Sequence, residues 1–82
     1  MSYRMSFGVV EARVTTLNTL RQRTRRQPGY FYLAAEFGEY VIYEVINEEG
    51  GVHRHTAGRL RECKQFVDGV IVGVALTKAE VS

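Results

Sequence analysis

The residues of this sequence that could perform chemistry include two histidines that lie close together. The segment "HRH" places His53 and His55 two residues apart, and both imidazoles then lie on one side of a strand. This spacing can chelate a metal ion, but two ligands do not complete a site, and only Glu48 or Glu49 could supply a third. We expect surface histidines, no metal and no other cofactor.

The single cysteine, Cys63, lies on the apolar stripe of the last expected helix, where a cysteine is most simply a small core residue. A nucleophilic cysteine needs a base within reach, and the sequence gives neither histidine a reason to lie beside it. We find no Ser-His-Asp grouping, no pair of acidic residues at positions that indicate catalysis, and no sequence motif typical of cofactor binding. The sequence predicts a protein that is not an enzyme. A small enzyme that uses His53 or His55 is the third of three hypotheses, after two kinds of binding protein.

The segment "RQRTRRQPGYFY" puts four arginines within six residues, before a Pro-Gly break and three aromatic residues. If a helix continues to its end, Arg21 and Arg25 lie one turn apart, whereas Arg23 and Arg26 lie on the opposite side. The arginines then encircle the helix and do not line one side of it. Two interpretations stay open: cations that favour the end of a helix dipole, or contacts to phosphate or to an acidic partner.

The elements that position these residues follow from periodicity and turn signals. Apolar residues three and four apart predict a helix from about Ser6 to Arg26, although β-branched residues leave an early strand as the alternative. The helix must end near Gln27, because the residue before a proline is pushed out of the α region. Residues 30–37, 40–47 and 52–56 predict three strands, the first two joined by a type II′ turn at Gly38-Glu39.

Thr56 is the expected N-cap of a final helix. Its apolar stripe consists of Leu60, Cys63, Val67, Val70 and Val74, and a strand over 70–76 is the competing interpretation. The predicted fold class is therefore α+β with the order αβββα. In this fold a three-stranded antiparallel sheet is packed on one face by an N-terminal and a C-terminal helix.

The hairpin register assigns side chains to the two faces of the sheet. A two-residue loop pairs Phe37 with Tyr40 and Ala35 with Ile42, on the apolar face that should lie against the helices. The other face then carries Tyr30, Tyr32, Ala34, Glu36, Val41, Tyr43, Val45 and Asn47. Its tyrosines and valines are too apolar for plain solvent. The candidate partner-binding residues are Tyr30, Tyr32, Tyr43, Val41 and Val45.

Three interpretations of this tyrosine-bearing face stay open, which differ in what covers it. A protein partner or a second copy suits tyrosine, which offers a large contact area and a polar tip at low entropy cost. The N-terminal segment could instead cover the face from within the chain. Single-stranded bases could also stack there, as they do on sheet-based RNA binders.

The length, composition and charge of the chain limit these hypotheses. The chain has 82 residues, of which 45% are hydrophobic, so we expect a single compact domain over residues 1–82 and no disorder. The net charge of +2 does not resemble the uniform basic coat of a general DNA binder. Residues 21–26 hold four arginines and no acid, whereas residues 36–49 hold five glutamates and no base. Such segregation suits a partner with a patterned surface, or a second copy of the chain.

The expected location follows from three observations. A lone cysteine cannot form an intrachain disulfide, which favours reducing conditions. Glu11 and Arg13 interrupt the first apolar run too early for a signal peptide. The run from Val70 to Leu76 is far shorter than the ~20 residues that a membrane span needs. We expect a soluble, cytoplasmic protein with no membrane partner.

The stretch from Gly29 to Val74 resembles small proteins encoded by bacterial phages, plasmids and other mobile elements. Its aromatic strand, its Gly-x-Tyr hairpin, its Gly-Gly turn and the Asp68-Gly69 step of its closing helix carry this likeness over a little over half of the chain. The resemblance implies no established activity. It implies a context in which small accessory proteins often occupy the surface of a host protein, as anti-CRISPR and other anti-defence inhibitors do.

The order αβββα also resembles a double-stranded-RNA-binding domain. That family reads RNA with a lysine cluster at the start of its last helix, where this chain has Arg59, Arg61 and Lys64, and the family's Gly-Pro-x-His loop is missing. The first hypothesis is therefore a non-enzymatic protein-binding protein, expected to be a homodimer. The alternative is RNA or DNA binding through the Arg21–Arg26 cluster together with Arg59 and Arg61.

Overall fold

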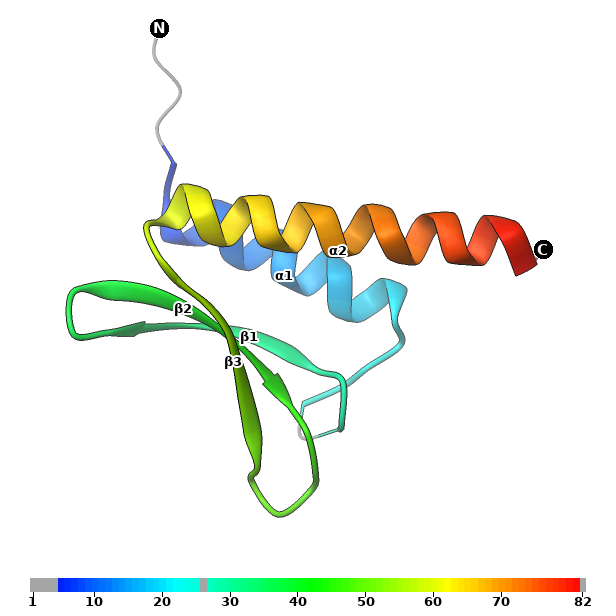
Figure 1. Ribbon diagram of the computed structural model, residues 1–82, viewed down its shortest axis with the longest axis horizontal. Helices are drawn as coiled ribbons and strands as arrows, with labels where there is room; N and C mark the ends of the chain where they lie inside the picture. The colour runs from blue at the N-terminus through cyan, green and yellow to red at the C-terminus, as the bar shows by residue number, and fades with distance from the viewer. Residues whose placement is uncertain (1–4, 26, 82) are drawn as a thin grey trace, which may run out of the picture.

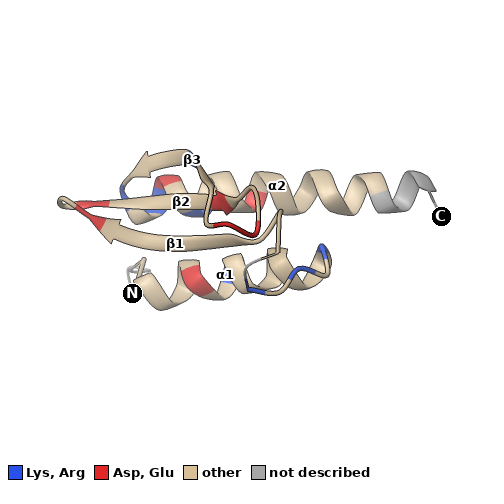
Figure 2. Cartoon of the chain, turned by 90° about the horizontal axis from the view of Figure 1, so that it is seen from below, with Lys and Arg blue, Asp and Glu red and all other residues tan. Residues whose placement is uncertain are grey.

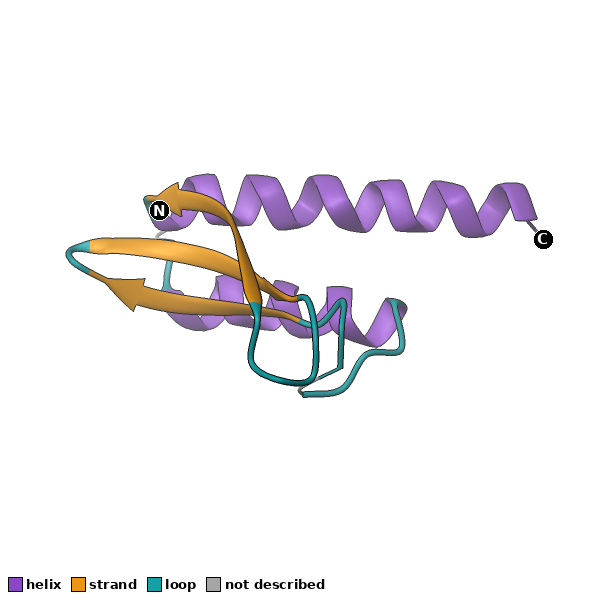
Figure 3. Ribbon diagram, turned by 60° about the horizontal axis from the view of Figure 1, so that its bottom comes forward, coloured by secondary structure: helices purple, strands orange, loops and turns teal. Residues whose placement is uncertain are grey.

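The computed structural model describes residues 5–25 and 27–81, with side chains up to Thr77. The elements follow one another as α1 (Phe7–Leu20), β1 (Phe31–Glu36), β2 (Glu39–Val45), β3 (Val52–Gly58) and α2 (Leu60–Val81). The strands form one antiparallel sheet in the order β1-β2-β3, and both helices lie on the same side of it (Figures 1 and 3). The predicted α+β fold with the order αβββα is confirmed.

The first helix begins and ends with local capping contacts. The Ser6 hydroxyl accepts a hydrogen bond from the Val9 amide at 3.3 Å, which satisfies one of the free amides of the first turn. The helix ends at Leu20, so the predicted end near Arg26 is wrong. Gln22 adopts a left-handed φ of 55°, and the Arg23 amide donates to the Asn18 carbonyl at 2.9 Å. This is the Schellman arrangement, which usually has glycine at the left-handed position, and glutamine there gave no sequence signal.

The hairpin between β1 and β2 turns one residue earlier than predicted. Its loop is Phe37-Gly38, and both residues have positive φ values of 48° and 79°, as in a type I′ turn. The predicted type II′ turn at Gly38-Glu39 is therefore wrong, and Ala35 pairs with Tyr40 instead of Ile42. Each pair moves by two residues, and because side chains alternate with period two, the predicted division of side chains between the two faces is confirmed.

The third strand continues past its predicted end. Thr56 pairs with Ile42 inside the sheet, so it is not the N-cap of the last helix. The Arg59 carbonyl accepts the first helical bond, from the Cys63 amide at 3.1 Å. The competing strand over 70–76 is wrong, because these residues are helical, and so is the early strand in place of α1.

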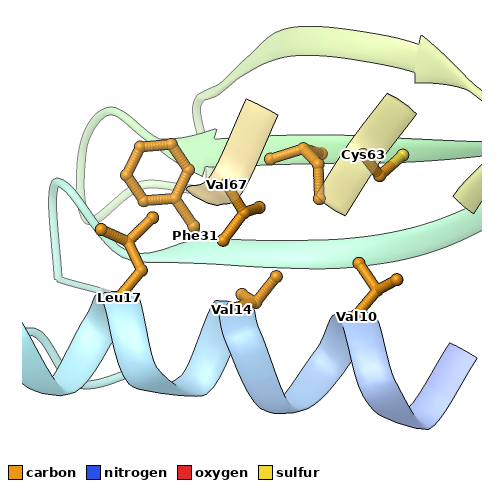
Figure 4. Close-up of a cluster of buried hydrophobic side chains, with 7 residues drawn as sticks. Val10, Val14, Leu17, Phe31, Cys63 and Val67 are labelled. Carbon is orange, nitrogen blue, oxygen red and sulfur yellow. The ribbon is translucent and has the colours of Figure 1, made fainter. Parts of the chain in front are cut away.

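The core lies between the two helices and one face of the sheet (Figure 4). It consists of Val10, Val14, Leu17, Phe31, Ile42, Cys63 and Val67. The α2 stripe that periodicity predicted supplies the buried Cys63 and Val67, with Leu60, Val70 and Val74 packed against them. Among the described residues, no helix is both long enough and apolar enough to cross a membrane.

One acidic side chain links the two helices. Asp68 of α2 accepts a hydrogen bond from Arg13 of α1 at 2.8 Å and another from Lys64 at 2.6 Å. Partial burial alone would raise the pKa of Asp68. The hydrogen bonds from Lys64 and Arg13 outweigh that effect, and the pKa lies below its ordinary value of 3.8.

We expect Asp68→Asn to destabilise the protein by about 0.5 kcal/mol at neutral pH, because the three side chains are partly exposed and solvent screens the ion pairs. A carboxyl with a lowered folded pKa stabilises the fold above its ordinary pKa and loses that contribution as the pH falls through the folded value. The difference between variant and wild type should therefore vanish below the folded pKa. Urea unfolding at neutral and strongly acidic pH measures it, and a constant difference would contradict the assignment.

Candidate binding surface

The sheet face that points away from the helices is defined here as the outer face. Its described side chains include Tyr32, Ala34 and Glu36 of β1, and Val41, Tyr43 and Val45 of β2. The rings of Tyr32 and Tyr43 stack with centroids 5.3 Å apart and planes 26° from parallel. The Tyr43 hydroxyl donates to Glu36 Oε1 at 2.7 Å, and this hydrogen bond to a carboxylate is the first cause of the raised pKa of Tyr43. The two rings form one fixed aromatic platform.

The two valines of the outer face flank Tyr43 along β2. Val41 is fully buried and Val45 is nearly so, and neither belongs to the core cluster on the helix side. Val41 is paired with Ala34 on one side and Ala57 on the other. The tyrosines are half-buried and the valines are buried, so the surface offered to a partner is mainly tyrosine.

An open pocket of about 610 Å³ adjoins the platform. Its apolar floor and wall consist of Tyr30, Tyr32, Val45 and Val52, and its polar rim of Arg25, Asn47, Glu48, Glu49 and Gly50. The rim is well ordered by local hydrogen bonds, because Asn47 Oδ1 accepts from the Glu49 amide at 3.1 Å and from the Gly51 amide at 2.9 Å. An apolar floor with a few convergent polar groups is typical of a binding pocket.

The candidate cations come from two separate parts of the fold, the loop after α1 and the start of α2 (Figure 2). Arg21 turns inward, donates to the Gly29 carbonyl at 3.1 Å and lies over the Phe31 ring at 5.3 Å. Gly29 has a φ of 94° and leaves room for this arginine and for Arg23, whose Nε lies 3.1 Å from where a Cβ would stand. Arg21 is therefore a packing residue. Arg26 lies outside the described residues.

Three further candidate cations divide between two places. Arg25 lines the pocket beside the tyrosines. Arg59 and Arg61 line a different open depression, which also includes Glu39 and Glu62. The four arginines do not encircle a helix as predicted, because α1 ends at Leu20, before the first of them.

The two histidines lie on the helix side of the sheet, and their rings meet edge to face at 4.5 Å. The His55 ring also packs on Phe31 and Phe66, with centroids 5.5 and 5.2 Å away, and its Nε2 lies 2.6 Å from Glu44 Oε1. Both histidines are surface residues, as expected, although Phe31, Phe66 and Glu44 partly cover the His55 side chain, at a point where β3 bulges opposite Ile42 and Tyr43 of β2.

The contacts of His53 and His55 are with each other and with neighbouring side chains of the fold. Within residues 5–25 and 27–81, no three His, Cys, Asp or Glu side chains gather as metal ligands. The buried Cys63 thiol donates to the Tyr40 carbonyl at 3.4 Å, four residues along β2 from Glu44, and burial raises its pKa. A protonated thiol at the other end of the strand is not placed to act with His55.

Asn18 is a residue that the sequence analysis did not single out. It is only 5% exposed, and its side-chain amide makes two 2.8 Å hydrogen bonds, one to the Phe31 carbonyl and one from the Phe31 amide. β1 is an edge strand, so these backbone groups have no neighbouring strand to pair with. A signal was present, since Asn18 follows Val14 by four residues and so falls on the buried side of α1.

These elements define an α+β protein with two helices on one side of a three-stranded sheet and an aromatic, pocketed face on the other. Comparison of the chain with protein-family models, with curated proteins and with solved structures finds no match.

Proposed function

We propose that the protein binds another protein through the outer face, with Tyr32 and Tyr43 as the central contacts. This proposal rests on one observation. A stacked pair of tyrosines lies beside an open pocket, on the face that neither helix covers. The pair is already ordered, so binding costs little side-chain entropy, and tyrosine is enriched at protein interfaces. Met5 packs on the core and Phe7 on Tyr40 of the opposite face, so these two residues do not cover the tyrosines.

The charges around the outer face indicate the chemistry of the partner. The pocket rim carries Glu48 and Glu49 beside Arg25, and around Tyr43 lie Glu36 and Arg54, of which Arg54 is paired with Glu39 at 3.7 Å, so carboxylates outnumber cations. This surface would repel a phosphate backbone and would attract lysine or arginine side chains. A partner with an aromatic or aliphatic side chain for the pocket and cations around it fits best. The likeness to proteins of mobile elements suggests a host protein, as for an anti-defence inhibitor.

RNA or DNA binding is the second candidate, and one observation favours it. The tyrosine platform lies near Arg25, and unpaired bases stack on aromatic rings while cations neutralise phosphates. Binding of this kind weakens steeply as salt rises, because phosphate contacts release counterions.

The test compares wild type with Tyr32→Ala/Tyr43→Ala, and with Phe37→Ala as a control that removes an exposed aromatic ring from the hairpin tip. Circular dichroism first establishes that all three are folded. Each is then used to capture proteins from an extract of the source cells, and each is titrated with a mixed pool of short RNA and DNA at low and high salt.

We expect one protein to be captured by wild type and by Phe37→Ala, and not by the double variant. We also expect no binding to the pool. Capture that survives the loss of both tyrosines would contradict the proposal, and salt-sensitive binding of the pool that needs Tyr32 and Tyr43 would replace it with the nucleic-acid function.

A further inference from the structure

Residues 69–77 of α2 contain no charged residue, so this part of the helix has no charged side. Val70, Ile71 and Val74 pack against the core, yet Val72 and Leu76 are 57% and 61% exposed. Val72 and Leu76 are one turn apart and project away from the core-facing residues, at about 100° per residue. Two turns before Val72, Gln65 occupies the same exposed side, so this side changes from polar to apolar along the helix.

The remaining polar group of this segment is already satisfied. The Thr77 hydroxyl donates to the Gly73 carbonyl at 2.9 Å, so residues 69–77 present no unpaired side-chain donor. A helix that is apolar on all sides is normally covered by another surface. Toward its C-terminus α2 also extends beyond α1 and the sheet, so the described chain leaves this part uncovered (Figures 1 and 3).

The shape of the segment is complementary to itself. Val72 and Leu76 form a ridge, and Gly69 and Gly73 form a shallow groove beside it, with no atom within 4 Å of a Cβ built at either glycine. If two copies of α2 cross antiparallel about a two-fold axis near Gly73, each ridge lies over the glycines of the other copy. Such a contact is isologous and therefore closes as a dimer. Small residues at the crossing let the backbones approach closely.

The apolar surface continues around the helix and increases the area available. An open groove of about 810 Å³ runs along α2 and is lined by Phe31, Phe66, Val70, Gly73 and Val74, with Arg21, Glu44, His55 and Thr77 also at its walls. Gly73 belongs both to this groove and to the exposed side. A specific interface needs roughly 1,000 Å² in total, and a second helix end against both surfaces contributes more than one ridge alone.

We propose that residues 69–77 of α2 form the interface between two copies of this chain. Homodimer interfaces are more apolar than interfaces between different proteins, and the same uncharged segment of a second copy matches this one in shape and in polarity. The interface lies on the helix side of the molecule, so dimerisation leaves both outer faces free. The proposal does not depend on what the outer face binds.

The test is light scattering across a dilution series, at low and high salt. We expect wild type to have twice the 9.3 kDa mass of one chain, with little dependence on salt. Leu76→Glu places a charge in the interface and should give a monomer throughout. Gln65→Glu adds the same charge to the same side of α2, one turn before the apolar segment, and should remain a dimer.

A cysteine variant tests the two-fold geometry of the proposed interface. Under oxidising conditions Gly73→Cys should form a disulfide-linked dimer, because the two-fold axis brings the two thiols together, and Gln65→Cys should not. A wild-type monomer at every concentration would overturn the proposal, as would a dimer that Leu76→Glu leaves intact. A monomer that binds phosphatidylcholine vesicles through Leu76 would replace it with a lipid surface.

Discussion

Replacement of Asn18 by leucine should lower the free energy of unfolding by about 2–4 kcal/mol, the largest effect expected of any single substitution at a polar residue here. Leucine has the same number and branching of side-chain heavy atoms, so no cavity forms. The cost arises because the amide and the carbonyl of Phe31 both lose their partner inside the protein. Each buried backbone group without a partner costs about 1–3 kcal/mol. Urea unfolding of the two proteins measures the difference.

Thr19→Ala is the matched control for Asn18. Thr19 is the next residue of α1 and is exposed, and its hydroxyl donates only to the Thr15 carbonyl of its own helix. Its loss should change stability by less than about 0.5 kcal/mol, as surface substitutions usually do. If Asn18→Leu were as harmless as Thr19→Ala, the edge of β1 would not depend on the side-chain amide.

Replacement of Phe37 by asparagine should raise stability by about 1 kcal/mol, because a left-handed conformation costs a bulky L-residue about 1–2 kcal/mol. Phe37 has a φ of 48° and is fully exposed, so its ring offers no packing to offset that cost. Asn-Gly is the preferred sequence of a type I′ turn. The shift in the thermal midpoint relative to wild type measures the gain.

The paired control is Gly38→Ala in the same turn. Gly38 has a φ of 79° and nothing within 4 Å of an added Cβ, so alanine there meets no clash and its effect is conformational alone. It should destabilise the protein while Phe37→Asn stabilises it. Destabilisation by both would mean that the Phe37 ring makes contacts that the turn geometry does not reveal.

The order and packing of the helices and strands were predictable because they follow from the spacing of apolar residues along the chain. The stripe from Leu60 to Val74 fixed the buried side of α2, and alternation within β1 and β2 fixed both faces of the sheet. The face assignment survived an error in the hairpin loop, because a slip of two residues returns each side chain to the same face. The tyrosines were thus placed on the outer face from sequence.

The features that were not predictable depend on single unusual residues. Gln22 in a left-handed conformation ends α1, a position at which sequence rules look for glycine. The early end of the helix then turns Arg21 onto Phe31, so Arg21 packs on the core and is not part of a helical ring of arginines. The bulge in β3 shifts the pairing with β2 at Ile42 and Tyr43, and a bulge without glycine leaves no sequence signal.

The two proposed surfaces have a joint consequence. A dimer formed through α2 would carry two outer faces, and the second contact to a dimeric or repetitive partner would be intramolecular. Monomeric Leu76→Glu should then bind such a partner more weakly than wild type does, although its tyrosines are unchanged. Loss of the tyrosines should weaken binding whatever the oligomeric state.

The most direct test of the central claim is photo-crosslinking in source-cell extract, with benzoylphenylalanine in place of Tyr32 in one sample and in place of Val72 in another. We predict that position 32 yields a covalent adduct with a different protein and that position 72 yields a covalent dimer of this chain. Adducts at position 32 with nucleic acid alone, or with no macromolecule at all, would contradict a protein-binding function for the outer face.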